Sequence, residues 1–178
     1  MASDTAYVDT IESESSHLAD EFPTATDDYK IIGNYNYTLE VPQEMEMTSE
    51  LSDAASLQYK HPDGYLYVIV IDEWKADVIG TEGADTSLEA YFDFSVGNMT
   101  NSATKMTGPY VQNANGLRGL MAKVKQLDAS YDYYLYTVVY ASRKKLYQLH
   151  VWTTNELRSV YEDDLKRIVN SFKEVENG

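Results

Sequence analysis

The chain has 178 residues, of which 43% are hydrophobic, so it is long and apolar enough to fold around a core of its own. Its formal net charge of −15 disfavours binding to the phosphate backbone of nucleic acids. The absence of cysteine excludes disulfides, thiol nucleophiles and thiolate metal sites.

The first 28 residues differ in composition from the rest of the chain. They carry eight acidic residues and no lysine or arginine, and Ser, Thr and Ala fill most other positions. Such a segment buries too little apolar surface to offset the conformational entropy lost on ordering. We therefore predict a disordered acidic tail over residues 1–28 and a single domain over residues 29–178.

The domain opens with strand patterns. Apolar and polar residues alternate over 37–41, which predicts a half-buried strand that Pro42 ends. A hairpin is predicted over 54–72 around the turn His61–Gly64, whose Pro, Asp and Gly suit a tight turn. Its second strand, 65–71, is apolar on both faces, which predicts a central strand covered on both sides. This is the longest apolar run in the chain, and it is far shorter than the roughly 20 residues of a membrane-spanning helix.

A helix and a second hairpin are predicted in the middle of the chain. Thr86–Glu89 has capping-box spacing, and apolar residues recur behind it at helical spacing, which predicts a helix over 86–101. The runs 105–112 and 117–127 flank Asn113–Gly116, whose Asn-Gly chemistry is typical of a hairpin turn.

The most apolar hairpin is predicted over 131–152, where two β-branched and aromatic runs flank a short basic turn. Thr153–Glu156 again has capping-box spacing and precedes the strongest helix pattern of the chain. The apolar stripe of that helix is Leu157, Val160, Tyr161, Leu165, Ile168, Val169 and Phe172. Because strands joined by short turns pair antiparallel, the sequence predicts an α+β fold with one antiparallel sheet flanked by helices.

Four segments carry a family resemblance: the strand Tyr37–Pro42, the strand Leu57–Tyr59, the helix from Leu88 and the closing Ile168–Lys173. In this order they resemble the PsbP-like superfamily, which includes the extrinsic PsbP proteins of photosystem II, Ran-binding Mog proteins and DcrB-type bacterial envelope lipoproteins. The resemblance covers roughly residues 29–173. It implies an αβα sandwich of PsbP-like type and a binding or assembly role, and it implies no reaction.

Catalytic and metal-binding patterns find little support in the sequence. His150 could act as a base with Asp132 across the hairpin, but we favour a half-exposed structural histidine. There is no G-x-S-x-G elbow, P-loop or dinucleotide-binding glycine pattern. The carboxylate pairs lack the spacing of calcium or zinc sites. We therefore predict that the protein is not an enzyme, with no catalytic or metal-ligating residue and no cofactor.

Charge and aromatic patterns indicate three candidate binding residues. The segment from Arg118 to Lys145 contains six bases and two acids within an acidic chain. Lys123 and Lys125 share one strand face there, which suggests a basic strip for an anionic partner or membrane headgroups. The alternative is that these lysines neutralise the domain's own acids or protect a strand edge. Trp74 follows the predicted central strand and is a candidate contact residue, with a stability role as the alternative.

The leading hypothesis is a non-enzymatic protein-binding or assembly module of a bacterial cell envelope, with an unknown protein partner. The acidic tail resembles the spacer after a lipoprotein or secretory signal, so we expect a monomer in an extracytoplasmic, periplasmic or envelope-associated location. A signal that has been removed could supply a membrane tether. The alternatives are a small-ligand carrier with a cavity between sheet and helices, and a hydrolase built on His150 and Asp132.

Overall fold

The structure is a computed structural model that describes residues 28–82, 85–101, 103–128 and 131–175. The predicted tail therefore lies outside the described residues, apart from Asp28. Within the described residues, no helix is long and apolar enough to span a membrane. In chain order the elements are β1 (Tyr29–Gly33), β2 (Tyr37–Pro42), β3 (Glu46–Met47), β4 (Leu57–Lys60), β5 (Leu66–Trp74), α1 (Lys75–Glu82), α2 (Leu88–Gly97), β6 (Thr104–Val111), β7 (Arg118–Asp128), β8 (Tyr131–Ala141), β9 (Lys145–Thr153), α3 (Arg158–Ser171) and β10 (Lys173–Glu174).

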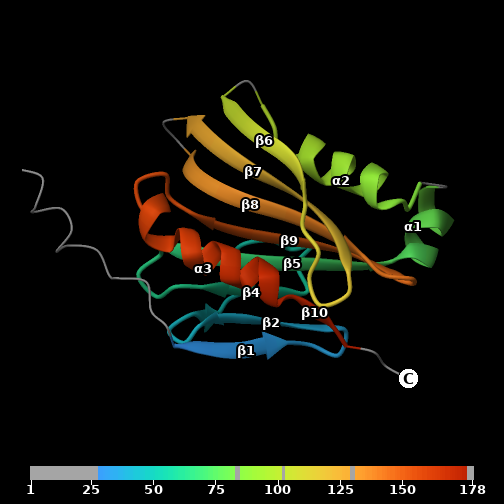
Figure 1. Cartoon of the computed structure of the whole chain (residues 1–178), viewed down its shortest axis with the longest axis horizontal. Coiled ribbons are helices and arrows are strands. Elements are labelled where there is room, and N and C mark those ends of the chain that lie inside the picture. Colours follow the sequence, from blue (N-terminus) through green and yellow to red (C-terminus); the bar gives the residue numbers. More distant parts are fainter. Residues whose placement is uncertain (1–27, 83–84, 102, 129–130, 176–178) are drawn as a thin grey trace, which may run out of the picture.

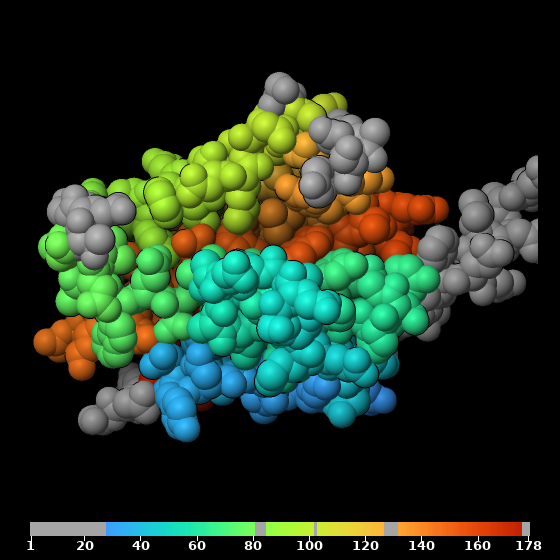
Figure 2. All heavy atoms as spheres, turned by 180° about the vertical axis from the view of Figure 1, so that it is seen from behind, coloured from blue at the N-terminus to red at the C-terminus, as the bar shows by residue number. Residues whose placement is uncertain are grey.

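The strands form two antiparallel sheets, which confirms the predicted α+β class and adds a sheet that the sequence did not predict. The large sheet has seven strands in the order β3-β4-β5-β9-β8-β7-β6, and the small sheet has the order β1-β2-β10. Helix α3 lies in front of the large sheet and beside the small one (Figure 1). Helix α2 packs against β7, β8 and β9 on the other face, which Figure 2 shows from behind.

The central strand of the large sheet is β9, not the predicted strand over 65–71. Every residue of β9 except Trp152 is buried, because α3 covers one of its faces and α2 covers the other. Strand β5 lies one place nearer the edge. Its Leu66, Val68 and Val70 are fully buried on the α3 side, whereas Ile69 and Ile71 are only half-buried on the other side.

Local signals placed the hairpins well. The β6–β7 turn has Asn115 at φ 46° and Gly116 at φ 87°, which is the backbone that an Asn-Gly hairpin turn requires. Strand β6 then carries a bulge between Thr107 and Tyr110. Gly108 lies in this bulge at φ 119°, and a Cβ there would approach the Met121 carbonyl oxygen to 2.7 Å, so the position requires glycine.

The helix ends differ from their predicted positions. Ser87, not Thr86, caps α2, because its side chain accepts a hydrogen bond from the Ala90 N–H at 3.2 Å. Helix α3 begins at Arg158 without a side-chain cap, and Thr154 instead accepts from the Leu157 N–H in the preceding turn at 3.3 Å. Helix α1 has only a weak amphipathic pattern and was not predicted.

An aromatic cluster joins the two sheets and α3. Phe172 directly follows α3 and is fully buried. Its ring stacks on Tyr37 of the small sheet with centroids 5.4 Å apart and on Tyr140 of the large sheet at 4.8 Å. Tyr147 meets it edge-on at 5.2 Å, and the Tyr140 hydroxyl donates a 2.6 Å hydrogen bond to the Val169 carbonyl. Aromatic pairs of this geometry stabilise beyond the area they bury.

Replacing Phe172 by alanine is expected to lower the free energy of unfolding by about 3–5 kcal/mol, because it removes the ring that packs between the two sheets at the end of α3. The matched control is Phe94→Ala on α2, whose side chain is 58% exposed and whose loss is expected to cost less than about 0.5 kcal/mol. Urea unfolding followed by circular dichroism measures both values. Equal losses would show that the cluster does not hold the layers together.

Candidate functional site

Lys123 and Lys125 lie on the α3 side of the large sheet, on one face of β7. Strand register places Lys125 opposite Lys105 of β6 and opposite Tyr134 of β8. One rung further along, Lys123 lies opposite Tyr136. Directly opposed residues of an antiparallel pair share a sheet face. Together with the first residue of α3, they form what we call the lysine–tyrosine face: the cations Lys105, Lys123, Lys125 and Arg158, around the buried rings of Tyr134 and Tyr136.

Lys123 is bound by the protein itself. Its ammonium nitrogen lies 3.4 Å from a carboxylate oxygen of Glu162 on α3 and 4.7 Å from the centroid of the Tyr136 ring. The Tyr136 hydroxyl donates a hydrogen bond to the same carboxylate. Burial raises the pKa of Glu162, but the Tyr136 hydrogen bond and the charge of Lys123 outweigh it and hold that pKa below its ordinary value. These contacts favour the structural alternative for Lys123.

Lys125, Lys105 and Arg158 have a different environment. Among the described residues, no carboxylate lies within ion-pair distance of any of the three. The Arg158 guanidinium lies 5.3 Å from the centroid of the Tyr134 ring. An open hollow of about 470 Å³ adjoins this ring, lined by Tyr134, Arg158, Ser159, Glu162 and Asp163.

Among the described residues, no carboxylate neutralises the two lysines at the centre of the face. Lys105 and Lys125 are directly opposed across β6 and β7. Like charges in this position destabilise a sheet. An anionic group bound between them would relieve that repulsion, so the face is suited to an acidic partner.

Trp74 lies elsewhere. It pairs with Lys145 at one end of β5, whereas Leu66 at the other end aligns through Thr153 with Tyr134. Trp74 and the two predicted lysines therefore do not form one site. Trp74 is 47% exposed, and the Lys145 ammonium lies 4.2 Å from the centroid of its ring.

The Lys145 ammonium beneath Trp74 belongs to a buried ion pair. It contacts Asp72 at 2.6 Å, and the two side chains are 5% and 8% exposed. The Asn36 amide donates a further hydrogen bond to Asp72 at 2.9 Å. Burial raises the pKa of Asp72, but these hydrogen bonds and the Lys145 charge lower it below its ordinary value. The geometry gives Trp74 a structural contact, and its role in partner binding remains a prediction.

The expected half-exposed position of His150 is wrong, because the side chain is buried between the large sheet and α2. Its Nδ1 lies 2.8 Å from the Thr137 hydroxyl, and its Nε2 lies 3.3 Å from the Gln148 amide oxygen. Gln148 in turn accepts from Ser95 at 2.9 Å and donates to Tyr91 at 2.8 Å. Both ring nitrogens are thus held in a buried network.

Asp132 does not meet His150. It pairs with Leu127 near one end of β8 and accepts a hydrogen bond from Asn155, while His150 pairs with Thr137. The structure therefore does not bring the candidate hydrolase pair together. Within the described part of the chain, no group of three or more His, Asp or Glu side chains is placed to hold a metal ion.

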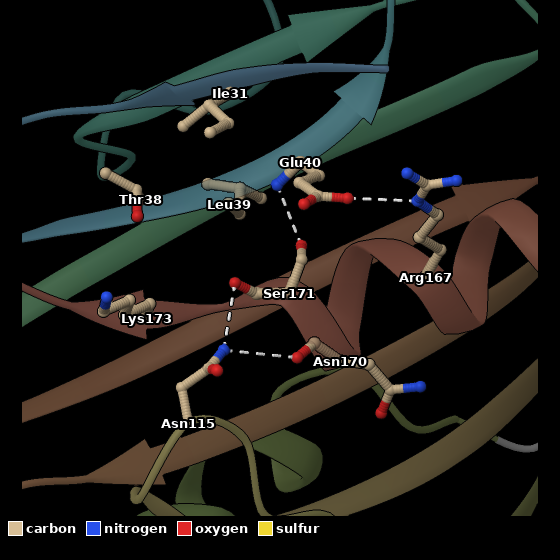
Figure 3. A pocket seen from close by; sticks show the side chains of 9 residues that line it. All are labelled: Ile31, Thr38, Leu39, Glu40, Asn115, Arg167, Asn170, Ser171 and Lys173. Carbon is tan, nitrogen blue, oxygen red and sulfur yellow. Dashed lines mark hydrogen bonds and ion pairs between the residues drawn. The ribbon is translucent and has the colours of Figure 1, made fainter. Parts of the chain in front are cut away.

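A second hollow, of about 380 Å³, lies between β2, the end of α3 and the β6–β7 turn (Figure 3). Its polar groups bind one another. Arg167 contacts Glu40 at 3.0 Å, and Ser171 accepts from the Glu40 N–H at 2.8 Å. The Asn115 amide donates to the carbonyls of the last two residues of α3 and, at 2.9 Å, to that of Phe172, which follows the helix. The polar groups that line the hollow are therefore already occupied by one another, and we do not regard the hollow as a binding site.

Comparison with known proteins shows the fold. No family model matches the chain, and no curated protein matches it in sequence. The structure of cyanobacterial PsbP (CyanoP) from Synechocystis sp. PCC 6803 is similar over 85% of this chain and 95% of its own, with a TM-score of 0.57 at 12% identity. That of LpqN, which is involved in cell envelope biogenesis of Mycobacterium tuberculosis, is similar over 84% and 91%, with a TM-score of 0.60 at 13% identity.

The chain therefore has a PsbP-like fold, which confirms the resemblance drawn from its sequence. At identities of 12% and 13%, this likeness establishes the architecture alone. The function has to be inferred from the residues at the surface.

Some residues of the lysine–tyrosine face were not identified from the sequence. Lys105 and Arg158 were not singled out. The alternation of β8 could have placed Tyr134 and Tyr136 on one face. No local signal brings Arg158 to that face, because its position depends on how α3 crosses the sheet.

Burial lowers the pKa of His150 to about 4, whereas an unfolded histidine titrates near 6.5. The unfolded chain therefore binds this proton at a higher pH than the folded one. The resulting stability is fully present above about pH 6.5 and is lost as the pH falls towards 4. In His150→Gln, we expect a smaller loss of unfolding free energy between pH 7 and pH 4. An unchanged loss in urea titrations at the two pH values would contradict this assignment.

Replacing Lys123 by methionine keeps its apolar stem but leaves Glu162 without its ammonium partner. We expect the free energy of unfolding to fall by about 1 kcal/mol, which is the upper end of the range for a partly exposed ion pair. Lys125→Met on the same strand face is the matched control, with an expected change below about 0.5 kcal/mol. Chemical denaturation distinguishes the two lysines, and equal effects would remove the structural role given to Lys123.

Proposed function

We propose that the chain is a non-enzymatic binding or assembly module of a bacterial cell envelope, which binds an acidic protein partner through the lysine–tyrosine face. The observation that carries this proposal is the opposed pair Lys105 and Lys125. Two like charges on adjacent strands cost stability, and no described carboxylate lies within ion-pair distance of either of them. A partner carboxylate placed between them would supply the missing neutralisation.

One neighbouring side chain, that of Arg158, suits such a partner. Arg158 provides a third cation and a planar group that binds carboxylates in a bidentate manner. It is held over the Tyr134 ring at 5.3 Å, next to the open hollow. An arginine positioned by an aromatic ring loses less side-chain entropy when it binds, which is a property of interface residues that contribute most to affinity.

The envelope location is supported by two observations of different kinds. LpqN, which shares the fold, is described as involved in cell envelope biogenesis. The N-terminal 28 residues also have the acidic Ser/Thr composition of a spacer that follows an export signal. We propose an extracytoplasmic, periplasmic or envelope-associated protein whose domain is a monomer tethered through this segment.

The alternatives receive less support from the described residues. The hydrolase hypothesis needs His150 next to Asp132, and the observed hydrogen bonds commit the imidazole to Thr137 and Gln148. A small-ligand carrier needs space between the sheet and its helices. The layer under α3 is instead filled by side chains that are at most 8% exposed, including Tyr136, Val138 and Leu165.

The proposal is tested by capture of proteins from a native envelope fraction, with the full chain as bait at low and high ionic strength. We expect capture at low ionic strength that is lost at high ionic strength, because charge contacts are screened by salt. The variant Lys105→Glu/Lys125→Glu should lose this capture.

The matched control is Arg143→Glu/Lys144→Glu, which makes the same change in charge at two exposed residues of the β8–β9 turn. It should capture the partner as the unmodified chain does. If the variant in β6 and β7 captures the same proteins as the control, the face is not the binding surface.

A further inference from the structure

The chain carries its own acidic segment, and the lysine–tyrosine face holds three cations without an ion-pair carboxylate among the described residues. Residues 1–27 contain seven acidic residues and no lysine or arginine: Asp4, Asp9, Glu12, Glu14, Asp20, Glu21 and Asp27. We propose that this segment binds the lysine–tyrosine face of the same molecule, and that the acidic partner must displace it. The inference rests on the proposed function of that face and adds its regulation.

The attachment point of the segment lies close to the face. The Asp28 carbonyl accepts a hydrogen bond from Gln43, and Tyr29 donates one to Asp164 of α3. Asp164 is six residues from Arg158, which is about 9 Å along a helix. Figure 1 shows that β1 begins at the same end of the molecule as α3.

The segment is long enough to reach the face. Even a random coil of 27 residues has a root-mean-square end-to-end distance of roughly 30 Å. A tethered segment of this length is present at its target at an effective concentration near the millimolar range. Weak charge contacts are sufficient for binding at such a concentration.

Three other cations on or near α3 are already paired. Arg167 binds Glu40, and Lys166 contacts both Glu162 and Asp163. Lys60 binds Glu50 at 2.7 Å. Lys105, Lys125 and Arg158 have no carboxylate at ion-pair distance among the described residues. Lys30 and Lys173 of the small sheet also lack one, but only the first three lie together on one face, which directs the segment there.

The test uses the full chain without any partner. Because the sequence has no cysteine, Ser13→Cys provides a unique site for a nitroxide label in the acidic segment. NMR then measures the line broadening that the label causes at backbone amides of the domain. We expect the strongest broadening at Lys105, Lys125 and Tyr134 at low ionic strength, and its loss at high ionic strength.

Two charge variants of the labelled chain identify the surface. Lys105→Glu/Lys125→Glu should abolish the broadening at the face, whereas Arg143→Glu/Lys144→Glu should retain it. Broadening that is no stronger at the face than at the β8–β9 turn would overturn the proposal. Broadening that persists in the β6–β7 variant would also overturn it.

Displacement by the partner is tested separately. Changing the seven acids to Asn or Gln should raise partner capture several-fold at a given ionic strength, because the competing segment no longer binds. Unchanged capture would overturn the displacement, even where the label shows contact. Loss of the labelled contact with partner capture intact would reject only the regulation, so failure of this inference is distinguishable from failure of the proposed function.

Discussion

The stacking of Phe172 between Tyr37 and Tyr140 is the contact on which the arrangement of layers depends. It joins the end of α3 to both sheets through three fully buried rings. The residues that follow it, Lys173 and Glu174, pair with β2 and so complete the small sheet. With its last turn held at this point and capped by Asn115, α3 crosses β9 and β8, and its first turns reach the lysine–tyrosine face.

Contacts between layers also explain why the chain has sixteen tyrosines and only four phenylalanines. Several tyrosine rings are buried in one layer while their hydroxyls bind a group in another. Tyr147 donates to Glu174 of the small sheet at 2.7 Å, and Tyr136 donates to Glu162 of α3. Each such residue contributes apolar burial together with a directional bond, which specifies how the layers are oriented.

Two sets of polar groups in the interior are satisfied by one another. Lys145, Asp72 and Asn36 form one closed set, and His150 belongs to another with Thr137 and Gln148. Buried groups of this kind support the fold and are not presented to a substrate. Lys105, Lys125 and Arg158, which have no carboxylate at ion-pair distance among the described residues, lie instead where a partner can reach them.

The sequence by itself determined what depends on neighbours along the chain. Periodicity identified the paired strands of the hairpins and the apolar stripe of α3, and it placed Lys123 and Lys125 on one face. The tertiary structure decided what depends on distant partners: the pairing of β10 with β2, the central position of β9 and the burial of His150. It also decided the composition of the candidate site. The β6–β7 turn alone would place Met106 opposite Lys125, but the bulge at Gly108 shifts the register by one residue and places Lys105 there. A one-residue shift moves every side chain of a strand to the other face. The sequence does not show this shift, because the bulge is defined only by the pairing of β6 with β7.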